Sequence, residues 1–302
     1  MWGFLFVFGG YILNIRELKI IGNKKLEENN IEDSVFKAEK LLQYVLNMDK
    51  TELLINNEML VDKENENKYL MLIDKLIKGK PLQYITNCQE FMKLNFFVDQ
   101  NVLIPQPDTE ILLEKVLDTI NKIKQLREIK ENRKQEKILV LDLCTGSGAI
   151  GISIKKYITD LEVYASDISK EALKIAELNA KNNDVQIHVI NSDMLENIKI
   201  KFDIIVSNPP YIETKELEKL PKDVQNEPQL ALDGGEDGLK YYKIIRDEGY
   251  KFLKDNGAIL LEIGYNQNRS VPDLFRNNEN YKNIEIYKDL SNIDRVVKIE
   301  KS

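Results

Sequence analysis

The fold is decided by the stretch Ile138-Leu139-Val140-Leu141-Asp142-Leu143-Cys144-Thr145-Gly146-Ser147-Gly148-Ala149-Ile150-Gly151. It opens with a short apolar run, passes through closely spaced glycines and continues into a helical pattern over residues 149–157, so it predicts a strand, a tight loop and a helix. Glycines in such a loop let the backbone approach a ligand closely, and the amide end of the helix can cradle that ligand. The stretch therefore predicts a nucleotide-type site at the start of a β-α-β unit.

The same alternation of strand and helix continues to the end of the chain. One helix is expected over residues 170–182 behind Ser169, and another over 108–123, before the glycine-rich stretch. The strand-like runs are residues 138–141, 162–165, 185–190, 202–206, 258–263, 284–287 and 295–299. These seven strands, alternating with helices, predict an α/β fold with a mostly parallel, doubly wound sheet.

The N-terminal part has a different pattern, because its apolar residues recur at helical spacing. Asp33 is expected to cap one helix, and Gly79 followed by Pro81 is expected to end a later one. The apolar faces of these two helices are Ala38, Leu41, Leu42 and Val45, and then Tyr69, Ile73, Leu76 and Ile77. We expect a small helical bundle.

A change to period two follows the bundle. Leu94, Phe96 and Val98 alternate with other residues, which predicts a short β-hairpin that connects the bundle to the α/β domain. The expected segments are an apolar N-terminal extension at 1–13, a helical domain at 14–84, a hairpin linker at 85–105 and an α/β domain at 106–302.

The extension at residues 1–13 is too short to cross a bilayer, which takes about 20 apolar residues. It also lacks the basic region and the small-residue cleavage site of a secretory signal. We expect an appendage to the fold, with weak attachment to a membrane or a partner as the alternative.

Composition narrows the classes of function. The chain has 302 residues and a formal net charge of -7, so charge gives no sign of a duplex nucleic-acid partner and fits a basic protein partner better. Its two cysteines, Cys88 and Cys144, predict a reducing cytoplasm rather than a disulfide framework. The single histidine, His188, lies in an alternating run and is expected in a strand, and no ligand cluster predicts a metal site.

Two carboxylates flank the glycine-rich loop. Asp167 stands nineteen residues after Gly148, where it can accept hydrogen bonds from ribose hydroxyls. The glycine spacing also fits a dinucleotide fingerprint, so the loop alone does not separate NAD from S-adenosylmethionine. Asp142 favours S-adenosylmethionine, because a carboxylate can hold its cationic amino acid portion, directly or through water, and would repel a pyrophosphate. The alternative is that Asp142 and Asp167 only cap the loop and the next turn.

A second motif, Asn208-Pro209-Pro210-Tyr211, follows the apolar run at 202–206. The prolines have fixed φ and restrict the residue before each of them, so the tetrapeptide is stiff. The Asn208 side-chain oxygen and the Pro209 carbonyl can then face outward as paired acceptors for an –NH2 group. Beside a methyl-donor site, this arrangement predicts methyl transfer to a planar nitrogen, with Tyr211 packed on the acceptor group.

Together these motifs resemble the release factor glutamine methyltransferase family. The resemblance runs from about Asn14 to the C-terminus. Besides Asp142–Gly148 and Asn208–Ile212 it includes Lys80–Ile85, Leu103–Glu110, Asn226–Leu232, Leu261–Gly264 and Asp289–Val297. It implies a class I, Rossmann-like methyltransferase domain over 106–302 and an N-terminal bundle that helps to recognise a partner.

The resemblance also implies an activity. Enzymes of this family transfer a methyl group from S-adenosyl-L-methionine to the side-chain amide nitrogen (N5) of the glutamine in the Gly-Gly-Gln motif of bacterial class 1 peptide chain release factors. Asn208, Pro209, Pro210 and Tyr211 match the glutamine-binding positions. The positions that match donor contacts are Cys144, Thr145, Gly146, Ser147, Gly148, Asp167, Met194 and Asn208. We expect a cytoplasmic monomer that contacts neither nucleic acid nor membrane.

Two positions depart from the family pattern. Cys144 stands where glycine is usual, and Gln106 replaces a frequent arginine between Pro105 and Pro107.

Three rival functions are an adenine-N6 methyltransferase of DNA or RNA, which uses the same tetrapeptide, a non-catalytic donor-binding scaffold, and a dehydrogenase.

Overall fold

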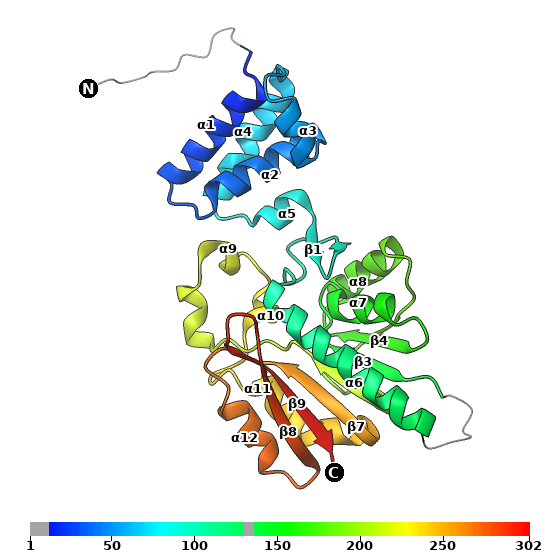
Figure 1. Ribbon diagram of the computed structural model, residues 1–302. Helices are drawn as coiled ribbons and strands as arrows, with labels where there is room; N and C mark the ends of the chain where they lie inside the picture. Colours follow the sequence, from blue (N-terminus) through cyan, green and yellow to red (C-terminus); the bar gives the residue numbers. More distant parts are fainter. Residues whose placement is uncertain (1–11, 130–135) are drawn as a thin grey trace. The chain divides into compact units, whose positions relative to one another are not determined.

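The computed structural model describes residues 12–129 and 136–302. Most of the apolar extension expected at 1–13 therefore lies outside the described residues. The chain divides into two compact units, Met1–Thr86 and Asn87–Ser302, and each is described by itself (Figure 1). None of the helices described in either unit is both long and apolar enough to cross a bilayer.

The first unit is the helical bundle that its sequence pattern predicts. Its helices are α1 (Ile15–Glu28), α2 (Ser34–Leu46), α3 (Lys50–Ile55), α4 (Lys63–Ile77) and α5 (Leu82–Thr86). Their apolar faces form one core around Tyr69, which is fully buried. Helix α1 passes close to this ring at Gly22, where a Cβ would lie 1.9 Å from the Tyr69 hydroxyl oxygen. Any larger residue at position 22 would push α1 away from α4, the helix that contains Tyr69.

The prediction that Asp33 caps α2 through its side chain was wrong. Asp33 does precede the helix, but its φ is 52° and its side chain makes no capping hydrogen bond. An N-cap side chain reaches the helix amides from an extended backbone, and the left-handed backbone here turns it away. Asn14, Asp49 and Asp62 provide this cap for α1, α3 and α4 instead.

The second unit begins with the predicted hairpin. Strands β1 (Gln89–Phe91) and β2 (Leu94–Phe96) pair antiparallel across Met92 and Lys93, which both have positive φ, as a two-residue hairpin turn requires. Phe91 and Phe96 pack edge to face with centroids 6.2 Å apart, and both belong to the core of this unit. The hairpin is thus anchored to the α/β domain by its aromatic side chains.

A seven-stranded sheet forms the centre of this unit, in the order β5-β4-β3-β6-β7-β9-β8. Its strands are β3 (Leu139–Leu143), β4 (Glu162–Asp167), β5 (His188–Asn191), β6 (Phe202–Ser207), β7 (Leu253–Glu262), β8 (Tyr281–Lys288) and β9 (Asp294–Lys301). The strands from β5 to β7 are parallel, whereas β9 runs antiparallel to both β7 and β8. The predicted mostly parallel α/β sheet is confirmed, and His188 is a strand residue as expected.

Helices cover both faces of this sheet (Figure 1). Alternate strand residues belong to two core clusters: Val140, Ile204 and Leu260 to one, and Leu141, Ile205 and Leu261 to the other. The first cluster packs against α6 (Glu110–Ile129), α7 (Ala149–Tyr157) and α8 (Lys170–Asn182), and the second against α11 (Lys240–Glu248) and α12 (Ser270–Arg276). The remaining short helices are η1 (Pro107–Thr109), η2 (Thr214–Lys219), α9 (Lys222–Gln225), α10 (Gln229–Leu232) and η3 (Gly249–Phe252).

The strand order places the two predicted motifs at one edge of the sheet. The chain moves outward from β3 to β5 and then returns to the other side of β3 with β6. At such a reversal the loops after the two central strands diverge and leave a crevice at their carboxyl ends. Leu143 pairs with Ser207 there, so the glycine-rich loop and Asn208 begin side by side.

Candidate functional site: a cavity at the carboxyl ends of β3, β4 and β6

A cavity of about 230 Å³ lies at this edge of the sheet. Of the predicted site residues, Cys144, Gly146, Asp167, Met194, Asn208 and Pro210 line it. The structure therefore brings together donor and acceptor residues that are up to 66 positions apart in the sequence, from Cys144 to Pro210. Asp142, Thr145, Ser147, Gly148, Pro209 and Tyr211 are not among its lining residues.

The glycine-rich loop has an unusual backbone. Cys144, Gly146 and Gly148 all have positive φ, at 61°, 53° and 81°. At Gly148 a Cβ would lie 2.7 Å from the Ile152 side chain, so this position requires glycine for space as well as conformation. Two carboxylates accept hydrogen bonds from this loop, one from a backbone amide and one from a side-chain hydroxyl.

Asp167 is the first of these carboxylates. Its Oδ2 accepts from the Gly146 N–H at 2.9 Å, and its Oδ1 accepts from the Ser169 N–H at 2.9 Å. Burial raises the pKa of Asp167, and these backbone donors oppose that rise. Asp167 thus joins the end of β4 to the glycine-rich loop and also forms part of the cavity wall.

Asp142 is the second carboxylate, and it supports the loop from beneath. Its side chain is fully buried, and Oδ2 accepts from the Thr145 hydroxyl at 2.6 Å and from the Gly151 N–H at 2.9 Å. Burial raises its pKa to about 7. Oδ1 has no hydrogen-bond partner among the residues that the structure describes. These contacts are those of the loop-capping alternative, and a contact of Asp142 with a donor stays a prediction.

Two sulfur side chains meet on the cavity wall. The Cys144 thiol lies 3.8 Å from the Met194 sulfur, and Met194 also has a positive φ, of 45°. Burial raises the pKa of the Cys144 thiol, so it is neutral at physiological pH. Cysteine at this position therefore adds a small uncharged side chain to the wall.

The acceptor motif directly follows β6. The Asn208 Nδ2 donates to the Thr109 hydroxyl at 3.3 Å, so its amino group is directed to the protein and its Oδ1 is available to a substrate. Two glycines support the backbone behind it. A Cβ at Gly234 would lie 2.7 Å from the Tyr211 Cα, and one at Gly238 would lie 2.5 Å from the Tyr211 carbonyl oxygen. The tetrapeptide is therefore held by its own prolines and by close packing.

Sequence reasoning missed Glu262, the last residue of β7. It is 2% exposed, and its Oε1 lies 3.5 Å from the Tyr211 hydroxyl. Burial raises its pKa to about 7, and the neighbouring Thr109, Arg295 and Asn208 side chains partly oppose that rise. Because Glu262 ends a long apolar run, no local signal separates it from an ordinary strand end.

Two further segments contribute to the cavity wall. The residues Gln100–Leu103 were not predicted as site residues, whereas Pro228, Leu230 and Ala231 belong to the stretch Asn226–Leu232 that carries the family resemblance. A buried carboxylate joins them, because the Glu227 Oε2 accepts from the Ile104 N–H at 2.8 Å. Burial raises the pKa of Glu227 to about 7. Gln106, which departs from the family pattern, is exposed, and its Nε2 donates to the Ile104 carbonyl at 3.0 Å.

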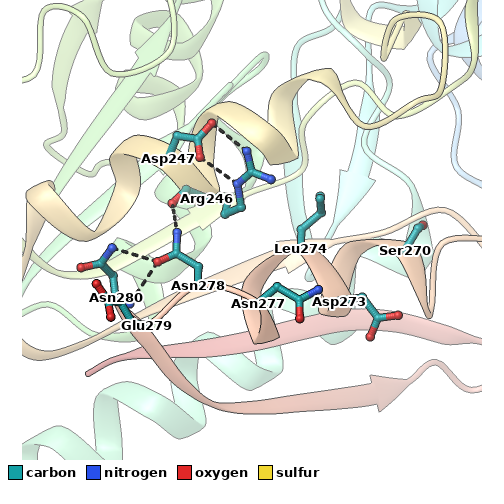
Figure 2. A pocket seen from close by; sticks show the side chains of 9 residues that line it. All are labelled: Arg246, Asp247, Ser270, Asp273, Leu274, Asn277, Asn278, Glu279 and Asn280. Atoms are coloured by element: carbon teal, nitrogen blue, oxygen red, sulfur yellow. Dashed lines mark hydrogen bonds and ion pairs between the residues drawn. The ribbon is translucent and has the colours of Figure 1, made fainter.

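A larger and more open hollow of about 650 Å³ lies elsewhere, against α11 and α12 (Figure 2). Figure 2 shows the Arg246 guanidinium paired with the Asp247 carboxylate. The two hydrogen bonds of this pair are both 2.8 Å long. Asn278 donates to the Arg246 carbonyl, and its Oδ1 accepts from Asn280. These polar groups are bound to one another, and none of the predicted site residues lines this hollow.

The charge of the smaller cavity selects among ligands. Its acidic lining residues are Asp167, Glu171 and Asp193, and no lysine, arginine or histidine of residues 12–129 and 136–302 lines it. Such a wall suits a sulfonium or ammonium cation and is unfavourable to the pyrophosphate of a dinucleotide. Among the described residues, no group of three or more histidine, cysteine, aspartate or glutamate side chains could hold a metal ion. The residues present therefore fit S-adenosylmethionine better than NAD.

Comparison with known proteins gives the family. Residues 18–86 match the PrmC N-terminal domain, and residues 118–227 match the methyltransferase small domain. The release factor glutamine methyltransferase of Clostridium acetobutylicum is 41% identical over 94% of this chain and 98% of its own length. The chain belongs to the release factor glutamine methyltransferase family. The namesake from Moorella thermoacetica is 36% identical over 90% of this chain and 93% of its own. The family predicted from the motifs is thus confirmed, and with it a methyltransferase activity.

Solved structures agree with this fold. A methyltransferase from Pyrococcus furiosus is similar with a TM-score of 0.50, at 15% identity, over 77% of this chain and 98% of its own. The hMettl16 catalytic domain has a TM-score of 0.54, also at 15% identity, over 73% of this chain and 82% of its own. The class I methyltransferase fold predicted for this family member is confirmed.

Proposed function

We propose that this enzyme transfers a methyl group from S-adenosyl-L-methionine to the side-chain amide nitrogen of the glutamine in the Gly-Gly-Gln motif of peptide chain release factors. The observation that carries the proposal is the shared cavity, whose wall contains both the glycine-rich loop and Asn208 and has acidic but no basic residues. The names of the relatives from Clostridium acetobutylicum and Moorella thermoacetica support the choice of substrate.

The donor would be held by the loop and by the ends of β3 and β4. The Asp167 carboxylate is positioned to accept from ribose hydroxyls. Gly146 offers space, since nothing lies within 4 Å of where its Cβ would be. Cys144 and Met194 provide a polarizable apolar wall. When bound, S-adenosylmethionine supplies an electrophilic methyl group on a sulfonium.

The protein's main contribution to the reaction is placement of the acceptor. An amide nitrogen is a weak nucleophile, because its lone pair is delocalised into the carbonyl. The Asn208 Oδ1 and the Pro209 carbonyl accept the two hydrogens of the substrate –NH2 and direct its nitrogen toward the donor cavity. Placement of this kind supplies about 7–11 kcal/mol in favourable cases. The same two dipoles favour the positive charge that develops on nitrogen during transfer. The methylated nitrogen then loses one proton to water and becomes the neutral N-methyl amide.

The remaining expectations belong to the same proposal. The substrate is a protein, the enzyme acts as a monomer, and neither nucleic acid nor a membrane takes part. The helical unit, whose residues 18–86 match the PrmC N-terminal domain, helps to recognise the release factor. The reaction takes place in the cytoplasm, where thiols such as Cys88 and Cys144 stay reduced.

The test is to incubate the enzyme with donor and a release factor and to measure the mass of the Gly-Gly-Gln peptide. The wild-type protein should add one methyl group to the glutamine. Asn208→Ala should abolish turnover and weaken donor binding, measured by calorimetry, far less. Asn277→Ala changes an exposed asparagine of the other hollow and should match the wild type. Methylation of DNA in place of the peptide, or full turnover by Asn208→Ala, would overturn the proposal.

A further inference from the structure

Glu262 has no part in the mechanism above, yet it stands beside the acceptor motif. Strands β6 and β7 are parallel, with Ser207 paired to Leu261, so the next residue of each strand, Asn208 and Glu262, lies at the same edge of the sheet. Asn208 donates to the Thr109 hydroxyl, and the side chains of Thr109 and Asn208 each lower the pKa of Glu262 as hydrogen-bonding neighbours.

Each of these hydrogen bonds has a defined donor and a defined acceptor. The Thr109 oxygen accepts from the Asn208 Nδ2, which leaves the hydroxyl hydrogen of Thr109 to be donated elsewhere. Glu262 offers the matching acceptor, because its Oε2 is buried and has no partner among the described residues. Its Oε1 faces the Tyr211 hydroxyl at 3.5 Å. An ionised carboxylate can only accept hydrogen bonds. The hydroxyl hydrogens of Thr109 and Tyr211 must therefore both point toward Glu262.

We propose that Glu262 is a positioning residue for methyl transfer. By accepting from Thr109, its carboxylate makes the threonine oxygen an acceptor for the Asn208 Nδ2 and so keeps the Asn208 Oδ1 turned to the substrate. The inference rests on the proposed function. If the Asn208 amide turned over, its –NH2 would meet the –NH2 of the substrate, and two donors cannot form that hydrogen bond.

When Glu262 is protonated, the Asn208 amide should no longer be held in one orientation. A protonated carboxyl can donate to Thr109, whose hydrogen is then free for the Asn208 Oδ1. The titratable groups that face Glu262 are Asp108 from η1, Arg295 from β9, Tyr211 from the acceptor motif and Tyr242 from α11. Arg295 is held by Asp108 and Asp289 at 3.0 and 3.2 Å, so its charge is shared with partners other than Glu262. Burial raises the pKa of Glu262 to about 7, so turnover should fall as pH drops through that value.

The experiment compares four proteins: the wild type, Glu262→Gln, Thr109→Val and Thr109→Ser. Glutamine has the shape of glutamate but can donate to Thr109, and valine has the shape of threonine but no hydroxyl. Both variants should lose about tenfold or more in kcat, with donor affinity nearly unchanged. Thr109→Ser keeps the hydroxyl and should lose much less. The fall in kcat below about pH 7 should disappear in Glu262→Gln.

A second measurement does not depend on turnover. The side-chain –NH2 signals of Asn208 in NMR spectra should shift with a midpoint near pH 7 in the wild type and stay constant in Glu262→Gln. If the wild type methylates no release factor, the proposed function fails, and these signals still decide the inference. Wild-type kcat and pH profile in Glu262→Gln, equal losses in both Thr109 variants, or Asn208 signals that ignore Glu262 would each overturn it.

Discussion

Glu262→Gln should stabilise the protein strongly at pH 8 and much less near pH 5. The wild-type carboxyl is 2% exposed, and burial raises its pKa from an ordinary value of 4.5 to about 7. The folded protein therefore binds a proton at Glu262 more tightly than the unfolded chain does. A favourable contribution from this group is complete below pH 4.5 and is lost as pH rises through 7.

The size of the effect follows from those two values. A rise from 4.5 to about 7 corresponds to about 3 kcal/mol, since each pKa unit is worth about 1.4 kcal/mol. Glutamine is neutral at every pH, so the variant avoids this loss. The gain in the free energy of unfolding should be about 1 kcal/mol near pH 5 and reach about 3 kcal/mol at pH 8 and above. In a unit of about 200 residues this is a rise in Tm of roughly 6–12 °C.

Thermal unfolding of the wild type and the variant at half-unit steps from pH 5 to pH 9 measures this difference. The buried carboxyls of Asp142 and Glu227 titrate in both proteins, so their effects cancel in the comparison. Glu279→Gln, at an exposed glutamate of the same unit, should show no such growth with pH. A difference that stays flat between pH 5 and pH 8, or a variant less stable than the wild type at pH 8, would refute the reasoning.

Four other variants, at three positions, test the site and its support. Gly234→Ala places a Cβ 2.7 Å from the Tyr211 Cα and should reduce kcat about tenfold or more while calorimetry shows donor binding largely kept. Cys144→Val puts a β-branched residue at a φ of 61° and should lower stability by about 2 kcal/mol, whereas Cys144→Gly should stay within about 1 kcal/mol in urea unfolding. Asn179→Asp removes donors to the carbonyls of Phe97 and Ser147, at 3.0 and 2.9 Å, and should cost about 3 kcal/mol in the same assay.

Local signals in the sequence were enough for the fold. Short apolar runs identified the strands of the sheet, and period-two alternation identified the hairpin. Ser169 was correctly expected at the start of α8, where its Oγ accepts from the Ala172 N–H at 3.1 Å. The prediction of a side-chain cap at Asp33 failed because residue type alone does not reveal a left-handed backbone. With a φ of 52°, the Asp33 side chain makes no capping hydrogen bond to the helix amides. The helix expected from residue 108 starts instead with η1, after which α6 runs to Ile129.

The acceptor motif and the glycine-rich loop could be located from sequence because each is a contiguous signature after an apolar strand. Glu262, Thr109 and Glu227 could not, because their contacts join residues far apart in the chain. The Tyr211 to Glu262 contact spans 51 positions, and the Ile104 to Glu227 contact spans 123. A lone acidic residue in sequence carries no information about which hydrogen bonds it will accept across such distances.

Three buried carboxylates around the cavity have pKa values raised to about 7, and each of them reduces stability at neutral pH. Evolution could have replaced each one with an amide of the same size at little structural cost. An amide differs from an ionised carboxylate in one respect, because the amide carries an –NH2 donor and the carboxylate has only acceptors. Asp142 accepts from the Gly151 N–H of α7, and Glu227 accepts from the Ile104 N–H, which directly follows the lining residues 100–103, so each carboxylate fixes the direction of one backbone N–H. Glu262 would likewise fix the orientation of the Asn208 side-chain amide, whose Oδ1 and Nδ2 have similar shapes and differ mainly in that one accepts and the other donates hydrogen bonds. Loss of stability at these positions is therefore the expected consequence of a site that must present an oxygen, and not a nitrogen, to its substrate.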